Sequence, residues 1–418
     1  ALSRAEDIWT AVSKVLYSDG ERLHFKKRGD LSELRAKQFH KEIIGRVKNG
    51  FLEFRYGKVS LPVIRKETDL WLMNELEAVE SYLKDPDFHD AYAINQMQQG
   101  EIVSTYRPCY ASIVCKTIRG KLRVYLHLTV EGLSFSKRTN DGIIKHPYGN
   151  GPVGCDIGTQ TIAYTSDHTV GLENLAERGN SICYVERWQR LVQRAMDRSR
   201  RAMNPDNYND DGTIRKGKKT WIKSKRYQKL QLRYRELCRI SAENRRLAIH
   251  EQVHKMRSLG DIFVTEAKNA KKLQKRANPE NPLDKNGRPK RKKRFGHSIQ
   301  NRCPGYFQAK VKQLFESTGG TYIEVPSDYR ASQYDHTVDD YIKKKLSQRM
   351  YNLKDGTKVQ RDWYSSFLLY CIDLITKTID RQKCLVTFET QLNKEHAMIE
   401  EIIHLKKHIM NSGIRVAA

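Results

Sequence analysis

The sequence predicts an α/β protein, and two observations support this prediction. Between Arg107 and Leu133, two β-rich runs flank a short turn that contains Gly120, a pattern typical of a β-hairpin. Farther along the chain, three short candidate strands at 153–174 precede a long polar zone of helical periodicity at about 180–258, and another strand follows at 261–269. Strands that alternate with helices in this way indicate the α/β class.

The first 150 residues combine strands with helical insertions. Apolar residues at helical spacing predict helices over 1–17, 31–47 and 69–83, and 51–63 reads as extended. The Gly- and Pro-rich run YGNGPVG at 148–154 then predicts a domain boundary. Because the chain begins at Ala1 and not at methionine, we expect residues upstream of it.

Basic residues dominate the composition. The 418 residues include 76 Lys and Arg against 49 Asp and Glu, a formal net charge of +27. A merely solvated basic surface is the alternative explanation, but like charges repel in a compact chain, and a polyanion relieves that repulsion. We therefore expect nucleic acid as the partner. The expected contacts lie in the polar helical zone and in a basic loop within 270–300: Arg198, Arg201, Lys218, Lys219, Lys225, Arg226, Arg233, Arg291, Lys292, Lys293 and Arg294.

Two other classes of protein are disfavoured. No apolar run approaches the length of a membrane span, so no membrane partner is expected. The eight cysteines are scattered and none forms a CxxC pair, so the sequence predicts reduced thiols without a disulfide framework or a Cys-rich zinc site.

Three acidic residues stand in apolar surroundings. Asp156 lies in an apolar strand, Glu266 ends the strand IFVTE, and Asp362 opens an apolar helix. Taken singly, each has an ordinary explanation: a turn residue, a strand-end charge and a helix N-cap. Burying a carboxylate is nevertheless costly unless it is paired or binds a cation. Two strands and one helix, each about a hundred residues from the next, suit convergence in one site.

Carboxylates in such a set suit phosphodiester cleavage. Hard oxygen ligands hold Mg²⁺ or Mn²⁺ and leave room for water and a phosphate oxygen. Two such ions activate the attacking water and stabilise the leaving oxygen.

The runs that contain these residues carry a resemblance to a known family. VGCDIGTQTIAYTSD (153–167), IFVTEAKN (262–269) and VQRDWYSSFLLYCI (359–372) resemble the three RuvC motifs of the transposon-encoded TnpB nucleases and of type V CRISPR effectors. The resemblance implies an RNase H-like (RuvC) fold, in which Asp156, Glu266 and Asp362 are the catalytic residues and hold two Mg²⁺ or Mn²⁺ ions. It also implies a guide RNA and double-stranded target DNA as partners, and a cytoplasmic, prokaryotic location.

The same resemblance implies a domain organisation. Residues 1–150 would form a wedge β-barrel with a helical recognition lobe, and RGKLRVYLHLTVEG (119–132) resembles the hairpin of that wedge. Residues 151–382 would form the nuclease domain, with the basic helical insertion at about 180–258, the basic loop at 270–300 and a further insertion at 327–358. Residues 383–418 would form a C-terminal helical tail.

The insertion at 327–358 departs from the family pattern. Many of these nucleases carry a CxxC…CxxC zinc ribbon there, whereas this segment has no cysteine and only one imidazole, His336. No zinc is expected, and a packed, metal-free substitute is the interpretation.

Three alternatives to RNA-guided cleavage stay open. The first is a guide-independent transposase or resolvase of the RNase H-like fold. The second is a nuclease-inactive, RNA-guided DNA-binding regulator, which the presence of all three acidic residues disfavours. The third is a general basic RNA-binding protein, for which the three carboxylates would be a coincidence.

Overall fold

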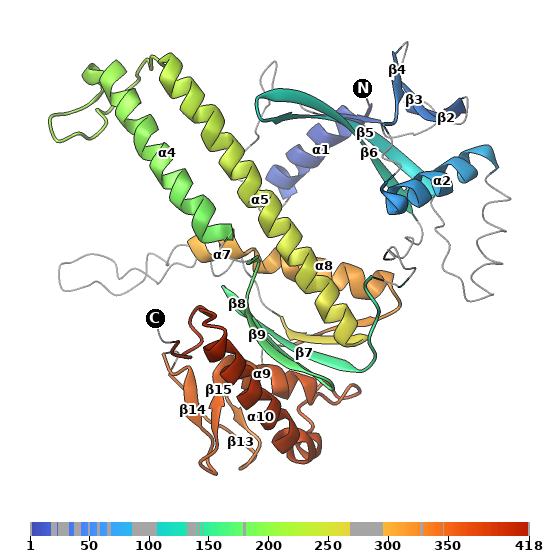
Figure 1. Cartoon of the computed structure of the whole chain (residues 1–418), viewed down its shortest axis with the longest axis vertical. Helices are drawn as coiled ribbons and strands as arrows, with labels where there is room; N and C mark the ends of the chain where they lie inside the picture. Colours follow the sequence, from blue (N-terminus) through green and yellow to red (C-terminus); the bar gives the residue numbers. More distant parts are fainter. Residues whose placement is uncertain are drawn as a thin grey trace. The chain divides into compact units, whose positions relative to one another are not determined.

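In the computed structural model the chain divides into two compact units, 1–145 and 146–418. The structure describes residues 2–17, 23, 33–36, 43–48, 51–56, 59–64, 68–85, 107–131, 139, 143, 145–178, 181–267, 296–326, 329–345 and 347–416. The mixed α/β class that the sequence predicts is confirmed, since both units contain helices and sheets (Figure 1).

The first unit is built around a long hairpin. Strands β5 (Arg107–Ile118) and β6 (Lys121–Glu131) pair antiparallel, as the sequence predicts, and Gly120 takes a positive φ of 76° in the turn between them. Helix α2 (Leu70–Lys84) begins after its N-cap Asp69 and supplies the buried Val79 to a small core with Ala111 of β5. Helix α1 spans Leu2–Tyr17.

One predicted helix of the first unit is wrong. The described parts of 31–47 are strands: β1 (Glu33–Ala36) pairs with β5, and β2 (Ile43–Lys48) pairs with β3 (Phe51–Tyr56), which in turn pairs with β4 (Val59–Pro62). Gly45, within β2, costs about 1 kcal/mol in a helix relative to alanine, and pairing with neighbouring strands outweighs the helical pattern. Among the described residues these strands form two open three-stranded sheets, so the closed wedge barrel stays a prediction.

A five-stranded mixed sheet forms the centre of the second unit, in the order β11-β10-β7-β8-β9. Strands β7 (Pro152–Ile157), β8 (Thr161–Ser166) and β9 (Val170–Asn174) form an antiparallel meander, and β10 (Ile262–Glu266) and β11 (Thr321–Val325) add in parallel beside β7. The four strands predicted at 153–174 and 261–269 are therefore confirmed.

Helices cover both faces of this sheet, and each face has its own core. Helix α9 (Arg361–Tyr370) and helix α10 (Arg381–His404) contribute to one core, which includes Trp363 and Phe367. The end of helix α5 (Lys225–Leu259) and helix α8 (Pro304–Ser317) contribute to the other, which includes Phe263 and Phe315 (Figure 1). The sheet is thus the middle layer of three.

Helix α4 (Ser181–Met203) and helix α5 pack against each other and, with the connector 204–224, form what we call the helical arm (Figure 1). The connector includes a short 3-10 helix, η1 (Pro205–Asn207), and Asn204 fixes it by hydrogen bonds to the backbone of Arg200 and Ile222. Every buried residue of α5 lies at or beyond Ser241, so its first sixteen residues project from the core.

The insertion after β11 is a small, packed element. Its paired strands β12 (Tyr334–Asp335) with β13 (Asp340–Tyr341) and β14 (Met350–Asn352) with β15 (Lys358–Gln360) lie beside α9 (Figure 1). The short helix α7 (Gly296–Arg302) precedes α8. All eight cysteines are free, and no helix within the described ranges is long and apolar enough to span a membrane.

Candidate active site and nucleic-acid surface

Asp156 and Glu266 lie side by side on neighbouring parallel strands. In the register of β7 and β10, Thr265 is opposite Cys155, and one residue farther on Glu266 comes opposite Asp156. Residues opposite each other in a sheet point to the same face. Both side chains are half-buried.

The face that Asp156 shares is the one that α9 covers. A Cβ added to Gly154 would lie 2.2 Å from the carbonyl oxygen of Ser366 and 2.2 Å from the amide nitrogen of Tyr370, so α9 crosses directly over Gly154. Side chains alternate between faces along a strand, so Asp156, two residues on, faces the α9 side as well. Glycine at 154 is therefore a condition for this close approach.

The direction of α9 brings its first turn toward Asp156. The hydroxyl of Tyr370, at the end of α9, bonds to Asp167, which follows β8 near the start of β7. One turn earlier in α9, the Ser366 hydroxyl lies 2.8 Å from that of Thr165, which pairs with Gly154. The helix therefore runs opposite to β7, and its first turn, which contains Asp362, lies toward the end of β7 that holds Asp156. We call the region of Asp156, Glu266 and Asp362 the carboxylate end of the sheet.

The start of α9 is fixed by buried polar contacts. Gln360 is the N-cap, since its side chain accepts a hydrogen bond of 2.7 Å from the Trp363 amide. The backbone N–H of Gln360 in turn donates a hydrogen bond of 3.0 Å to the carboxyl group of Glu395 in α10. Glu395 is fully buried, and burial raises its pKa to about 7 although the hydrogen bond from Gln360 lowers it. The explanation of Asp362 as a simple N-cap is therefore wrong.

The three carboxylates are suitable ligands in kind and in backbone placement, but their side chains are not gathered. Within the described ranges, no group of three or more His, Cys, Asp or Glu side chains is arranged to hold a metal ion. Asp362 instead forms an ion pair of 3.4 Å with Arg349, and its side chain is 17% exposed. In this structure the positive charge next to Asp362 is therefore that of Arg349.

The insertion at 327–358 is held by aromatic and charged contacts. The imidazole Nδ1 of the buried His336 lies 2.8 Å from the hydroxyl of Tyr364 in α9, and burial lowers the pKa of His336. Lys344 lies over the Tyr351 ring, with Nζ 3.7 Å from its centroid, and burial lowers the Lys344 pKa to about 8. The only histidine of the segment is thus hydrogen-bonded to a residue of α9.

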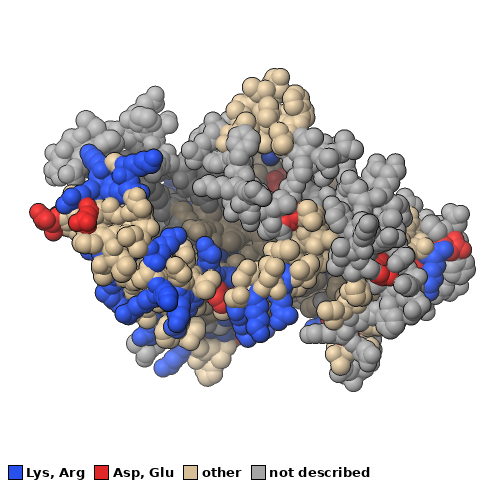
Figure 2. All heavy atoms as spheres, turned by 90° about the horizontal axis from the view of Figure 1, so that it is seen from above, with Lys and Arg blue, Asp and Glu red and all other residues tan. Residues whose placement is uncertain are grey.

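The basic residues expected to bind nucleic acid fall into two sets. Seven of them lie along the helical arm, and all but the half-buried Lys219 are exposed: Arg198, Arg201, Lys218, Lys219, Lys225, Arg226 and Arg233. The other four, Arg291, Lys292, Lys293 and Arg294, lie outside the described residues. Seen from above, Lys and Arg gather on the described surface with few Asp and Glu between them (Figure 2).

Some arginines of the arm are already in contact with aromatic rings. Arg201 lies over the ring of Tyr208 at 5.3 Å, and Arg233 lies over the ring of Trp188 at 5.5 Å. A guanidinium on a ring contributes to folding as well as to charge. Lys218, Lys225 and Arg226 show no such ring contact in the described arm, so they are the simpler candidates for phosphate contacts.

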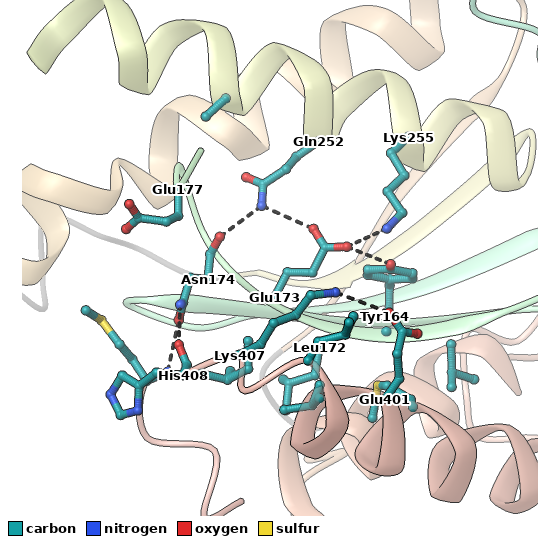
Figure 3. Close-up of a pocket in the computed structure, with 18 of the residues that line it drawn as sticks. Tyr164, Leu172, Glu173, Asn174, Glu177, Gln252, Lys255, Glu401, Lys407 and His408 are labelled. Carbon is teal, nitrogen blue, oxygen red and sulfur yellow. Dashed lines mark hydrogen bonds and ion pairs between the residues drawn. The ribbon is translucent and has the colours of Figure 1, made fainter. Parts of the chain in front are cut away.

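A cavity of about 870 Å³ lies elsewhere, beside the edge strand β9, and contains none of the three carboxylates (Figure 3). Glu173 accepts hydrogen bonds there from Lys255 and from the hydroxyl of Tyr164. Burial works to raise the pKa of Glu173, but Lys255 and the hydrogen bonds outweigh it and hold that pKa below its usual value. Asn174 also bonds to the backbone of His408 and Met410. This network fastens the chain's last segment to the sheet.

Two residues that contact the start of α9, near the carboxylate end of the sheet, were not predicted from the sequence. Glu395 and Arg349 are charged residues of a helix and of an insertion, and nothing in their local sequence distinguishes them from solvated charges. A signal for Glu395 exists only in retrospect: it falls at the apolar spacing of α10, between the buried Gln391 and Met398.

No protein-family model matches the sequence, and a search of curated proteins gave no match. The chain is similar to one chain of a solved structure, the cryo-EM structure of a Cas12f1–sgRNA–target DNA complex, with a TM-score of 0.42 and 10% sequence identity. The alignment covers 83% of this chain and 65% of that chain, so this chain spans less than two thirds of its length.

Proposed function

We propose that this protein is an RNA-guided, metal-dependent endonuclease that cleaves double-stranded DNA, and that its second unit is a RuvC-like domain of the RNase H-like class. The observation that supports this most is the convergence of Asp156, Glu266 and Asp362 on one face and one end of a mixed sheet. Sequence distances of 110 and 96 residues separate them, so their convergence is a property of the fold.

In this proposal, Asp156, Glu266 and Asp362 would hold Mg²⁺ or Mn²⁺, which would supply Lewis-acid chemistry for phosphodiester hydrolysis. The chain itself contributes orientation. β7 and β10 fix Asp156 and Glu266 relative to each other, and the packed helix α9 fixes the backbone of Asp362. Arg349, which pairs with Asp362 at 3.4 Å, would place a positive charge beside a bound phosphate.

The +27 charge supports a bound polyanion. We propose a guide RNA, which would supply sequence specificity by base pairing, with the protein itself reading a short motif of the duplex. The helical arm, with its exposed lysines and arginines, is the proposed surface for the phosphate backbones. Such a protein would act in the cytoplasm of a prokaryotic cell.

The experiment starts with the full chain purified from cells at low salt. Co-purifying nucleic acid is sequenced, and DNA that matches the variable part of any bound RNA is then tested for cleavage with Mg²⁺, beside a scrambled target. We expect cleavage of the matching target only. Metal-dependent cleavage of both targets without bound RNA would instead favour the guide-independent transposase or resolvase.

We also propose that zinc plays no part. The described insertion is held by the His336–Tyr364 hydrogen bond and the Lys344–Tyr351 contact. Elemental analysis of the purified protein should therefore give well below one zinc per chain. One tightly held zinc ion per chain would contradict this.

A further inference from the structure

An exposed tyrosine and a half-buried tryptophan form a cluster on the helical arm. Tyr184 of α4 is 64% exposed, and its ring meets that of Trp188 edge to face, with 6.3 Å between centroids. The guanidinium of Arg233, from α5, lies over the Trp188 ring. Leu191, one turn farther along α4, is 45% exposed. The Trp188 ring is thus supported from two sides, whereas the Tyr184 ring is left open to solvent.

Arginines share the helical face of this cluster. At 3.6 residues per turn, Arg187, Arg194 and Arg198 fall on the same side of α4 as Tyr184 and Leu191. All three arginines are exposed, and no ion pair is seen for them within the described ranges. An open aromatic ring is therefore flanked along the helix by uncompensated positive charges.

The acidic residues of α4 lie on its other side. The helix contains two, Glu186 and Asp197. Glu186 pairs with Arg190 and bonds to Asn301, and Asp197 pairs with Arg200. The Tyr184 face consequently presents aromatic, aliphatic and cationic groups but no carboxylate.

We propose that Tyr184, backed by Trp188 and Arg233, is a stacking site for an unpaired base of single-stranded nucleic acid. This inference rests on the proposed function, since it names the form of nucleic acid that this face of the arm binds. Every base has a flat face that stacks on an aromatic ring, while the neighbouring arginines meet the phosphates. In a duplex the bases are stacked inside and cannot reach the ring. An apolar protein partner would leave three arginines without counter-charges.

The test measures the affinity of the full chain, freed of nucleic acid at high salt, for fluorescein-labelled 20-nucleotide oligo(dT) and oligo(U) and for a 20-base-pair duplex. Fluorescence anisotropy gives each dissociation constant without added metal, so cleavage does not interfere. Tyr184→Ala should weaken single-strand binding about tenfold and leave duplex binding within about twofold. Because no charge is lost, the slope of affinity against salt should not change.

Three controls accompany this variant. Tyr184→Phe keeps the ring and should retain single-strand affinity. Tyr17→Ala removes another exposed tyrosine, 79% exposed on α1, and should have no effect. Arg198→Gln keeps the ring but removes a charge, and should lower the salt slope by about 0.7. The oligo(dT) and oligo(U) arms decide whether the unpaired strand is DNA or RNA.

Several outcomes would overturn the stacking site while leaving the proposed function intact. These are equal single-strand affinity of Tyr184→Ala and wild type, an equal loss for duplex and single strand, or a Tyr184→Phe variant as weak as Tyr184→Ala. A change of oligomeric state in Tyr184→Ala, seen by light scattering, would assign the face to a protein contact. If the wild-type protein binds none of the three probes, the proposed function itself fails.

Discussion

The carboxylate end of the sheet and the helical arm are built on opposite principles. β7 and α9 are embedded in the core: Cys155 is fully buried, and so is Trp363, the residue after Asp362. The first sixteen residues of α5 have no buried member, and the basic residues of the arm are mostly exposed. At the sheet, a shift of one residue in register would turn Asp156 and Glu266 to the wrong faces. Along the arm, charges act through solvent and tolerate such shifts.

This difference predicts how each region fails. A group whose position is fixed by packing contributes in an all-or-none manner, and its partners cannot replace it. Distributed phosphate contacts each add a little to affinity. Catalysis should therefore be lost by single substitutions at the sheet end, whereas binding should decline in steps along the arm.

The largest expected effect comes from removing a carboxylate. Asp156→Ala, Glu266→Gln and Asp362→Ala should each lower the rate of target cleavage at least about a thousandfold, equivalent to about 4 kcal/mol of barrier. Nucleic-acid binding should persist, because its contacts lie elsewhere. A gel assay of cleavage, run beside a filter-binding assay on the same preparations, separates the two.

The triad assignment also predicts non-additivity. A double variant should be no slower than either single one, since the residues act as a unit. If one of the three single variants cuts at the wild-type rate, that residue is not a ligand. Loss of binding together with cutting in all three would mean that the residues are structural.

The next effect is on stability. Gly154→Ala should lower the free energy of unfolding by about 3 kcal/mol, because the new methyl group would meet the backbone of α9 at 2.2 Å. Urea denaturation followed by circular dichroism measures this. Gly217→Ala, in the connector of the arm, has no atom within 4 Å of the added Cβ but a φ of 99°; its smaller cost would report backbone strain alone. Equal costs would argue against the close crossing of α9.

A pH effect should also distinguish the buried region. Because burial raises the pKa of Glu395 to about 7, the folded state holds this proton more tightly than the unfolded chain, whose value is 4.5. The associated stability is therefore present below pH 4.5 and is lost as the pH rises through 7, up to roughly 3 kcal/mol. Glu395→Gln keeps an acceptor for the Gln360 amide but cannot ionise.

The expected result is that Glu395→Gln matches the wild type in thermal stability at pH 5 and exceeds it at pH 8. His396, whose Nε2 lies 3.6 Å from the Glu395 carboxyl, is the neighbouring titratable group. His396→Gln therefore serves as a control and should leave most of the pH dependence in place. Parallel stability curves for Glu395→Gln and wild type would contradict the raised pKa.

The smallest expected effect belongs to the arm. Lys218→Ala and Lys225→Ala should each weaken binding several-fold and reduce the log–log salt slope by about 0.7 to 0.9. Lys377→Ala, an exposed lysine of the loop before α10, is the matched control and should change neither. A loss of more than a hundredfold from one arm lysine would mean that the arm, like the sheet end, depends on exact position.

Local patterns predicted most of the elements and singled out the three carboxylates, but they carried no information on the contacts around those residues. Apolar runs and a turn glycine predicted β5 to β10, because these signals act over a few residues. The strands at 33–36 and 43–48 were missed because their pairing with other strands outweighs local helical spacing. Asp362 was predicted as a ligand, but its partner Arg349 and the support from Glu395 depend on packing that no local pattern records.

The 35-residue helix α5 is a single continuous element that belongs to both the arm and the core. It spans about 52 Å at 1.5 Å per residue, with its free half in the arm and its fixed half in the core. At the fixed end, Arg257 bonds to the backbone of Gly149 and Gly260 and stacks on Tyr148. Gly149 precedes β7, and Gly260 precedes β10. Helix α5 therefore connects the arm directly to the starts of the two strands that carry Asp156 and Glu266.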